Sequence, residues 1–202
     1  MTSTNKNLTQ TLLNFSQNYS QQHIDKLGHL PIIAHDKEWL SLCEVGPHDA
    51  EHYYWQPVAI ETVVLTDENE STLSFSNVES ALELQLHADI KTYFTTIFSS
   101  DIEAICSEGK LSLLFAWNKE DFARLQENII GHILMKQKLK QDETIFFAVT
   151  DEEDMIISLD NTSGEVWVER VGCKPHKKLS DTLVDFISQL STDPNTLIFE
   201  DK

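Results

Sequence analysis

Residues 118–140, NKEDFARLQENIIGHILMKQKLK, are the most strongly patterned stretch of the sequence and decide its fold. Asn118 is a good helix N-cap, and the acids Glu120 and Asp121 suit the positive end of a helix dipole. Three lysines suit the negative end: Lys136, Lys138 and Lys140. Apolar residues recur at steps of three and four: Phe122, Leu125, Ile129, Ile130, Ile133 and Leu134. The spacing predicts an amphipathic helix with a wide buried stripe, in which Gly131 allows a close packing contact.

Three strand-like runs follow this helix, at residues 144–150, 155–159 and 165–171. The connections between them are short and rich in turn residues, so neighbouring strands must be antiparallel. In the third run polar positions, Glu165 and Glu169 among them, alternate with valines. That alternation indicates a strand with one wetter face.

Upstream of the long helix, residues 102–106 and 110–117 flank a loop with a glycine, which is typical of a β-hairpin. Near the start of the chain an apolar stripe predicts a helix that ends at Leu27-Gly28. Its members are Leu8, Leu12, Phe15, Tyr19 and His23.

Four shorter segments complete the prediction. Asn77 is a candidate N-cap for a short helix, and a final helix is expected from Ser180 to before Pro194. Residues 53–58 read as an extended segment that Pro57 keeps out of a central strand. Residues 90–98 fit a helix or a strand. Together these elements predict a single α+β domain, a mainly antiparallel meander sheet with helices packed against one face.

Charge is distributed very unevenly along the chain. Between Asp36 and Lys110 lie fifteen acids and three bases, so this stretch holds twelve of the eighteen net negative charges. Such a field attracts cationic partners and repels polyanions. Nucleic acid needs a basic surface and is therefore excluded as a ligand class, whereas a basic protein surface is indicated. Acidity also confers solubility by itself, and charge alone leaves these two interpretations open.

Composition excludes several other classes of protein. The three cysteines, Cys43, Cys106 and Cys173, are odd in number and far apart, which argues against a disulfide framework or a thiolate zinc site. We expect buried free thiols in a reducing cytoplasm. The first twenty residues are polar, and no apolar stretch approaches the roughly 20 residues of a membrane span. These features predict a soluble protein that stays where it is made.

One short motif fits a metal site. His48-Asp49-Ala50-Glu51-His52 matches H-x-x-E-H, which requires both histidines on one face of a rigid helix and a third ligand elsewhere. Gly46-Pro47 precedes the motif and an extended run follows it, so barely one helical turn is available. We therefore expect no metal here and keep a metallohydrolase only as an alternative for testing. The sequence has no phosphate loop and no nucleophile elbow, and it predicts neither catalytic residues nor a cofactor.

Five segments carry a resemblance to a known family: Tyr54-Trp55-Gln56-Pro57, Tyr93-Phe94-Thr95-Thr96-Ile97-Phe98, Trp117 with Glu120-Asp121-Phe122, Gln126 to His132, and Ser163-Gly164-Glu165-Val166. With them the sequence resembles the bacterial Syd family over most of its length, and the segment from Gln126 to His132 is the most specific. The resemblance predicts a Syd-like domain at residues 1–190 and a C-terminal tail at 191–202. His48 and His52 lie outside the matching segments.

This resemblance implies a non-enzymatic protein of the cytoplasm that binds SecY, the channel subunit of the protein translocase. An acidic concave surface would meet basic cytoplasmic loops of SecY and would monitor or restrain the translocase. The protein would lie peripherally on the cytoplasmic side of the inner membrane, attached only through its protein partner. The family is also similar to the SUKH superfamily, which includes immunity proteins. An inhibitor that binds a basic toxin is therefore the alternative.

Acids within or beside the matching segments are the candidate binding residues: Glu79, Glu83, Asp89, Asp101, Glu103, Glu120, Asp121, Glu127, Glu152, Glu153 and Asp154. Each is also explained as an ordinary solvated carboxylate, and Glu120 and Asp121 suit the helix dipole as well. Four aromatic residues are expected in the core rather than at the contact surface: Trp55, Tyr93, Phe94 and Trp117.

Overall fold

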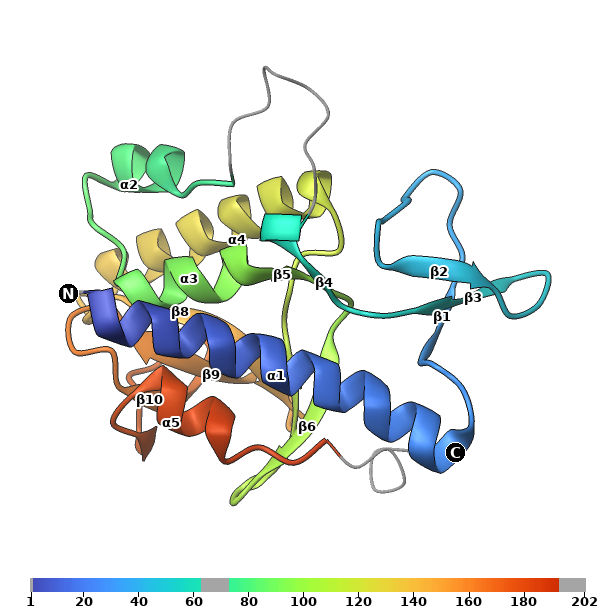
Figure 1. Cartoon of the computed structure of the whole chain (residues 1–202). Coiled ribbons are helices and arrows are strands. Elements are labelled where there is room, and N and C mark those ends of the chain that lie inside the picture. The colour runs from blue at the N-terminus through green and yellow to red at the C-terminus, as the bar shows by residue number, and fades with distance from the viewer. Residues whose placement is uncertain (1, 63–72, 193–202) are drawn as a thin grey trace.

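Six strands form one antiparallel sheet, in which every strand pairs with its neighbour in sequence, in the order β11-β10-β9-β8-β7-β6 (Figure 1). The computed structural model describes residues 2–62 and 73–192. The strands are β6 (Ile102–Cys106), β7 (Gly109–Leu113), β8 (Thr144–Thr150), β9 (Met155–Asp160), β10 (Val166–Arg170) and β11 (Lys177–Ser180). The predicted α+β fold with its antiparallel meander is confirmed, as is the hairpin of β6 and β7.

The long helix α4 (Lys119–Lys138) connects β7 to β8. Asn118 caps it as predicted, because its side chain accepts a hydrogen bond from the backbone N–H of Asp121 at 2.8 Å. Most of the predicted stripe is buried: Phe122, Leu125, Ile129 and Ile133. The cap and the stripe together hold the start of α4 in a fixed place beside the end of β7.

Two expectations for α4 were wrong. Leu134 is 51% exposed, because it lies about 100° around the helix from Ile133 and so falls off the buried stripe. A Cβ atom built on Gly131 would meet nothing within 4 Å, so this glycine makes no close packing contact.

Helices cover both faces of the large sheet, not one face as predicted. The consecutive residues Phe146 and Phe147 of β8 face opposite sides. Phe146 meets the ring of His132 from α4, with ring centroids 5.4 Å apart. Phe147 meets Tyr93 from α3 (Ala88–Thr96) and Phe186 from α5 (Leu183–Ser188). The core therefore lies in two layers, one on each side of the sheet.

The first helix, α1 (Thr2–Leu27), packs against α3 and α5 and crosses in front of the sheet in Figure 1. Leu8 and Leu12 on its stripe are completely buried. The helix ends at Leu27 as predicted, and Gly28 follows with a positive φ of 80°. A residue with a side chain is strained in that left-handed conformation, which explains a glycine at the end of this helix.

A second, three-stranded sheet lies to one side of the molecule. It has the order β1-β3-β2, with β1 (Ile32–Ala34), β2 (Glu44–Pro47) and β3 (His52–Trp55). The expectation that Pro57 excludes a central strand was wrong, since β3 is central and ends two residues before that proline. The chain continues through β4 (Val58–Ala59), which pairs with β5 (Ile97–Phe98), and a 3₁₀ turn, η1 (Ile60–Thr62).

Three other boundaries differ from the prediction. The short helix α2 (Ser76–Leu82) is present, but Asn77 lies inside it and Phe75 takes the cap position. The ambiguous residues 90–98 contain both structures, since α3 ends at Thr96 and β5 follows directly. Ser180 ends β11, a strand that the sequence reasoning missed, and Thr182 caps α5.

The four aromatic residues expected in the core are buried there: Trp55, Tyr93, Phe94 and Trp117. Of the cysteines, which are free thiols, Cys43 is buried, Cys106 is partly buried and Cys173 is exposed, so the expectation of buried thiols holds fully for Cys43 alone.

In the described part of the chain, no helix has the length and apolar character needed to cross a membrane. Ser191 pairs with Ile105, and residues 193–202 of the predicted tail lie outside the described part.

A buried polar network lies between α4 and the sheet. Lys136 and Glu169 are both fully buried, and the Lys136 Nζ lies 2.8 Å from Oε2 of Glu169. Thr144 donates to the other carboxylate oxygen at 2.8 Å, and the Nε2 atom of His132 lies 3.5 Å from it. Lys136 lies in the last turn of α4 as predicted, but its side chain is buried in this ion pair. The wetter face predicted for Glu169 was wrong, because Glu169 is fully buried. This face of β10 is covered by α4 and holds an ion pair instead.

Candidate functional site

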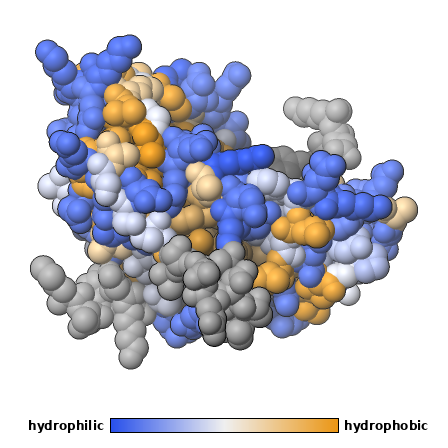
Figure 2. Space-filling view, turned by 90° about the horizontal axis from the view of Figure 1, so that it is seen from above, coloured by the Kyte–Doolittle hydropathy of each residue, from blue (hydrophilic) through white to orange (hydrophobic). Residues whose placement is uncertain are grey.

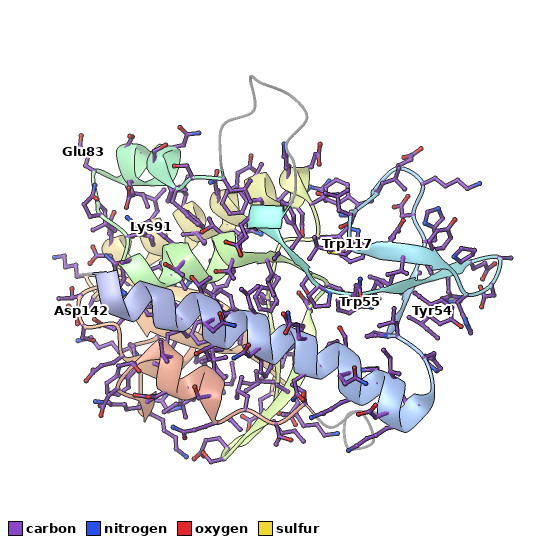
Figure 3. The ribbon with its side chains drawn as sticks, viewed as in Figure 1. Tyr54, Trp55, Glu83, Lys91, Trp117 and Asp142 are labelled. Atoms are coloured by element: carbon purple, nitrogen blue, oxygen red, sulfur yellow. The ribbon has the colours of Figure 1, made fainter. Side chains whose placement is uncertain are left out.

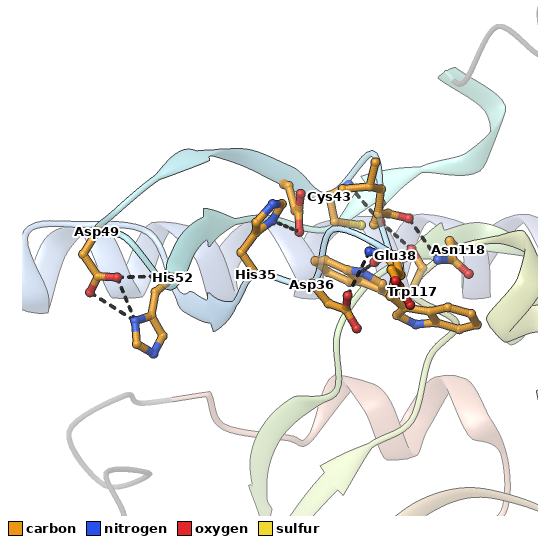
Figure 4. Close-up of polar contacts among 12 residues, drawn as sticks. His35, Asp36, Glu38, Cys43, Asp49, His52, Trp117 and Asn118 are labelled. Atoms are coloured by element: carbon orange, nitrogen blue, oxygen red, sulfur yellow. Dashed lines mark hydrogen bonds and ion pairs between the residues drawn. The ribbon is translucent and has the colours of Figure 1, made fainter.

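The segment between β1 and β2 is fastened to the start of α4 by side chains from both sides. The indole N–H of Trp117 donates to the backbone oxygen of Trp39 at 3.1 Å, and the Asn118 side-chain amide donates to that of Leu40 at 2.9 Å. The hydroxyl of Ser41 donates to the backbone oxygen of Trp117. Asn118 thus caps α4 and holds this segment at the same time (Figure 4).

The aromatic rings behind this segment make its base rigid. Trp55 and Trp117 meet edge to face, with centroids 6.0 Å apart, while Tyr54 lies farther out along the small sheet (Figure 3). The ring of His35 stacks on Tyr53 at 3.9 Å. Side chains on this segment are therefore presented from a fixed backbone.

A concave region of about 230 Å³ lies between this segment and the end of β5, and we call it the acidic hollow. Its lining includes four carboxylates and two indole rings: Asp36, Glu44, Asp101, Asp121, Trp39 and Trp117. Asp36 and Asp101 are exposed at its mouth, while the side chain of Glu44 is only 10% exposed. Asp36 lies between β1 and β2, and Glu44 begins β2. Asp101 directly precedes β6, and Asp121 lies in the first turn of α4.

Some of these carboxylates already have partners inside the protein. The carboxylate of Glu44 lies 3.1 Å from the Nδ1 atom of His35. Asp121 accepts a hydrogen bond from the backbone N–H of Trp117 at 2.8 Å. Asp36 accepts from the backbone N–H of Glu38 at 2.9 Å. Arg124 lies over the ring of Trp39, 4.1 Å from its centroid, at the edge of the same hollow.

Burial, and for Asp101 also nearby negative charge, raises the pKa of two acids near the hollow. Burial, together with the nearby negative charges of Glu103 and Asp121, raises the pKa of Asp101 to about 6, although a hydrogen bond from the backbone of Phe115 opposes the rise. Burial likewise raises the pKa of Glu103. A positive charge placed here would relieve both effects.

The chemistry of the acidic hollow suits a guanidinium or ammonium group. Carboxylates accept charge-assisted hydrogen bonds from such groups, and the ring of Trp39 already carries one guanidinium, that of Arg124. Within residues 2–62 and 73–192, no three metal-binding side chains gather closely enough to hold a metal ion.

A second concave region of about 520 Å³ adjoins the first, and we call it the apolar hollow. It shares Glu44 and Trp117 with the acidic hollow. Its apolar lining is Leu40, Leu42, Val45, Tyr53, Phe98 and Trp117. Figure 2 shows apolar side chains exposed among polar ones over the part of the molecule that holds the small sheet.

The structure brings together only some of the eleven candidate acids. Asp101 and Asp121 line the acidic hollow, Glu103 lies close enough to perturb Asp101, and Glu120 lines the apolar hollow. Glu127 is exposed farther along α4. Asp101 and Glu103 lie at the start of β6, whereas Glu120 and Asp121 lie in the first turn of α4.

The other candidates lie elsewhere. Glu79 on α2 accepts from the Lys91 side chain at 2.7 Å and from the backbone N–H of Leu86 at 3.0 Å, so it holds α2 to α3. Asp89 is buried in the first turn of α3, and Glu83 ends α2 in a left-handed conformation. A further three form the exposed turn between β8 and β9: Glu152, Glu153 and Asp154.

Sequence reasoning missed Asp36 and Glu44 as members of a site. Both belong to the acid-rich stretch that starts at Asp36, which was the available signal. They were passed over because they lie outside the segments that carry the family resemblance. Their grouping with Asp101 depends on contacts between residues 78 positions apart, which no local pattern reveals.

The H-x-x-E-H motif forms a tight turn between β2 and β3. Asp49 accepts backbone hydrogen bonds from Glu51 and His52, and its carboxylate lies 2.9 Å from Nδ1 of His52. The backbone hydrogen bond from Glu51, followed by the His52 side chain, lowers the pKa of Asp49 to about 2. His48 is turned to the hydroxyl of Tyr54 at 2.8 Å. The two histidines are not on a helix, so this turn lacks the helical arrangement that the H-x-x-E-H motif requires.

Comparison with known proteins shows which family the sequence matches. The family model described as Syd protein (SUKH-2) matches residues 9–192. A "Protein Syd" of Colwellia psychrerythraea is 72% identical over 191 residues, which cover 95% of this chain and 96% of that protein. A "Protein Syd" of Alteromonas mediterranea is 47% identical over 160 residues, covering 79% and 83%. A third, of Pseudoalteromonas atlantica, is 41% identical over 167 residues, covering 81% and 84%.

Proposed function

The chain belongs to the Syd family, and from that membership we propose that it binds SecY at the cytoplasmic face of the inner membrane. It uses the acidic hollow to receive lysine or arginine side chains from cytoplasmic loops of SecY. The observation that carries this proposal is the gathering of four carboxylates in one concave region. No chemical step is assigned to the chain, which acts by occupying or monitoring the translocase.

The electrostatics of the whole chain support the same partner. A net charge of -18 attracts a basic loop over a distance and repels anionic surfaces, so contact with the membrane runs through the protein partner. Close to the surface, a cation beside Asp101 offsets the repulsion that this carboxylate experiences from Glu103 and Asp121. Long-range charge sets the association rate, and the hollow sets where the loop binds.

A salt series of binding to purified SecY in nanodiscs tests the proposal. Affinity is expected to fall steeply between 50 and 300 mM NaCl, because exposed charges are screened over about 10 Å at 0.1 M. The test variant combines Asp36→Asn, Glu44→Gln and Asp101→Asn. Its matched control changes the same number of charges in the turn between β8 and β9, with Glu152→Gln, Glu153→Gln and Asp154→Asn.

Both triple variants lose three charges, so a non-specific field effect weakens them equally. The proposal expects the hollow variant to bind at least tenfold more weakly than the turn variant, with circular dichroism confirming that both are folded. Equal affinities would remove the acidic hollow from the contact. If the turn variant were the weaker binder, the contact would move to the turn between β8 and β9.

The SUKH-2 description favours one second function, inhibition of a basic toxin by the same hollow. Pull-down from detergent-solubilised membranes and from the soluble fraction of the same cells separates the two. Recovery of SecY supports the first function. Recovery of a soluble basic toxin, lost in the hollow variant, supports the second.

A further inference from the structure

We propose that the apolar hollow receives a bulky apolar side chain of the same partner segment whose basic side chain enters the acidic hollow. The occupant is thus a peptide segment with a leucine- or phenylalanine-like residue close in sequence to an arginine or lysine. This inference rests on the proposed function, because it defines the chemistry of the loop that the protein recognises. It adds an apolar requirement to a contact otherwise described by charge alone.

Exposed apolar side chains gather at the apolar hollow. Nine large apolar side chains are exposed in the described part of the chain, and the three most exposed lie within six residues of one another. They are Leu40 at 58%, Val45 at 55% and Leu42 at 63%. Single exposed leucines are ordinary on protein surfaces, whereas three gathered around a hollow mark a contact site.

Hydrogen bonds hold the backbone that presents these side chains. The backbone oxygen of Leu40 is held by Asn118 at 2.9 Å, and Ser41 is held by Trp117 and in turn accepts from the backbone N–H of Cys43 at 3.1 Å. The leucines on either side of Ser41 are therefore presented in a fixed arrangement. A partner residue that fills the hollow does not have to order this segment, which favours binding.

Continuity between the two hollows identifies the occupant. They share Glu44 and Trp117 as a common wall, so a single short segment reaches both. Residues of an extended chain advance about 3.3 Å each, which places the apolar and the basic residue within a few positions of each other. Two acids, Glu44 and Glu120, and one base, Lys119, line the apolar hollow. Its charge therefore also favours a basic segment.

The form of β2 indicates that side chains, rather than strand addition, make this contact. β2 is an edge strand that lines the apolar hollow, but its register with β3 shifts between Glu44 and Gly46, and Pro47 ends it. A bulge and a proline are the usual means of preventing a further strand from pairing at an edge. The partner segment therefore binds by filling the hollow.

Binding of purified SecY in nanodiscs at 50 and 500 mM NaCl tests this inference. The variant is Leu40→Gln with Leu42→Gln, and the matched control is Leu134→Gln, which is 51% exposed on α4. The double variant is expected to bind about tenfold more weakly than the control at both salt concentrations, with the same salt dependence. Binding within twofold of the control at 500 mM would overturn the inference, although SecY binding itself would stand.

A peptide experiment tests the hollow independently of SecY. Two labelled twelve-residue peptides in a glycine-serine host carry two arginines each, and one of them has a leucine where the other has a serine. Fluorescence anisotropy is expected to show at least fivefold tighter binding of the leucine peptide to the wild-type chain, and no preference in the double variant. Equal binding of the two peptides to the wild-type chain would overturn the inference, whether or not SecY binds.

Discussion

Replacing Lys136 with methionine tests the buried network directly. Methionine keeps the length and helix propensity of the side chain but removes its charge. Glu169 then stays fully buried without its cation, while it keeps the hydrogen bond from Thr144 and the neighbouring His132. Removing one partner of a buried ion pair costs about 3–5 kcal/mol, and the remaining contacts place our expectation near 3 kcal/mol.

A loss of that size is a large part of the 5–15 kcal/mol that stabilise a typical domain. The measurement is urea unfolding at pH 7, followed by circular dichroism and tryptophan fluorescence. Lys138→Met is the matched control, an exposed lysine on the same helix that is expected to change stability by less than about 0.5 kcal/mol. The double variant Lys136→Met with Glu169→Gln removes both charges of the ion pair and is expected to recover at least half of the loss.

The effect has a defined pH dependence. Burial alone would raise the pKa of Glu169, but hydrogen bonds from His132, Lys136 and Thr144 outweigh it and lower the pKa. A lowered carboxyl pKa contributes stability above the unfolded-state pKa, and this contribution is lost as the pH falls through the folded-state value. The difference between wild type and Lys136→Met should therefore shrink below about pH 4. A Lys136→Met variant within 1 kcal/mol of wild type at pH 7, or no recovery in the double variant, would refute this reasoning.

Two further predictions concern the core and the acidic hollow. Ile133→Ala should lower the free energy of unfolding by roughly 2–5 kcal/mol, whereas Leu134→Ala on the exposed side should change it by less than about 1 kcal/mol; equal losses in urea unfolding would contradict the helix orientation. Asp101→Asn should stabilise the protein at pH 7.5, because the raised carboxyl pKa of about 6 means that wild-type stability falls as the pH rises from 4 to 6. Unfolding midpoints at pH 4 and pH 7.5 check the sign, and a variant less stable than wild type only at pH 7.5 would reverse it.

Long periodic elements were predictable from the sequence because their pattern is local. The stripe of α4, the cap at Asn118 and the runs that form β8, β9 and β10 all follow from the spacing of apolar residues. The short strands β4, β5 and β11 were not, since strands of two to four residues are defined by their partners rather than by their own pattern.

The burial of Lys136 could have been predicted from its spacing along the helix, but it was missed. It lies three residues after Ile133 and seven after Ile129, on the buried face of α4, where a lysine requires a buried partner. The favourable dipole position gave an easier explanation and hid the ion pair. For the candidate site, Asp101 and Asp121 were predictable from the hairpin leading into α4, whereas Asp36 and Glu44 join them through bonds to Trp117 and Asn118.

The packing of α1 has a consequence for synthesis of the chain on the ribosome. α1 ends at Leu27, but its partner helices begin at Ala88 and at Leu183, about 60 and 156 residues later. At about 5–20 residues per second, the second partner is complete roughly 8–30 s after α1 has been made. Over that interval the face that carries Leu8 and Leu12 has only part of its final cover. The first helix of the fold therefore completes its packing only when one of the last elements of the chain has been made.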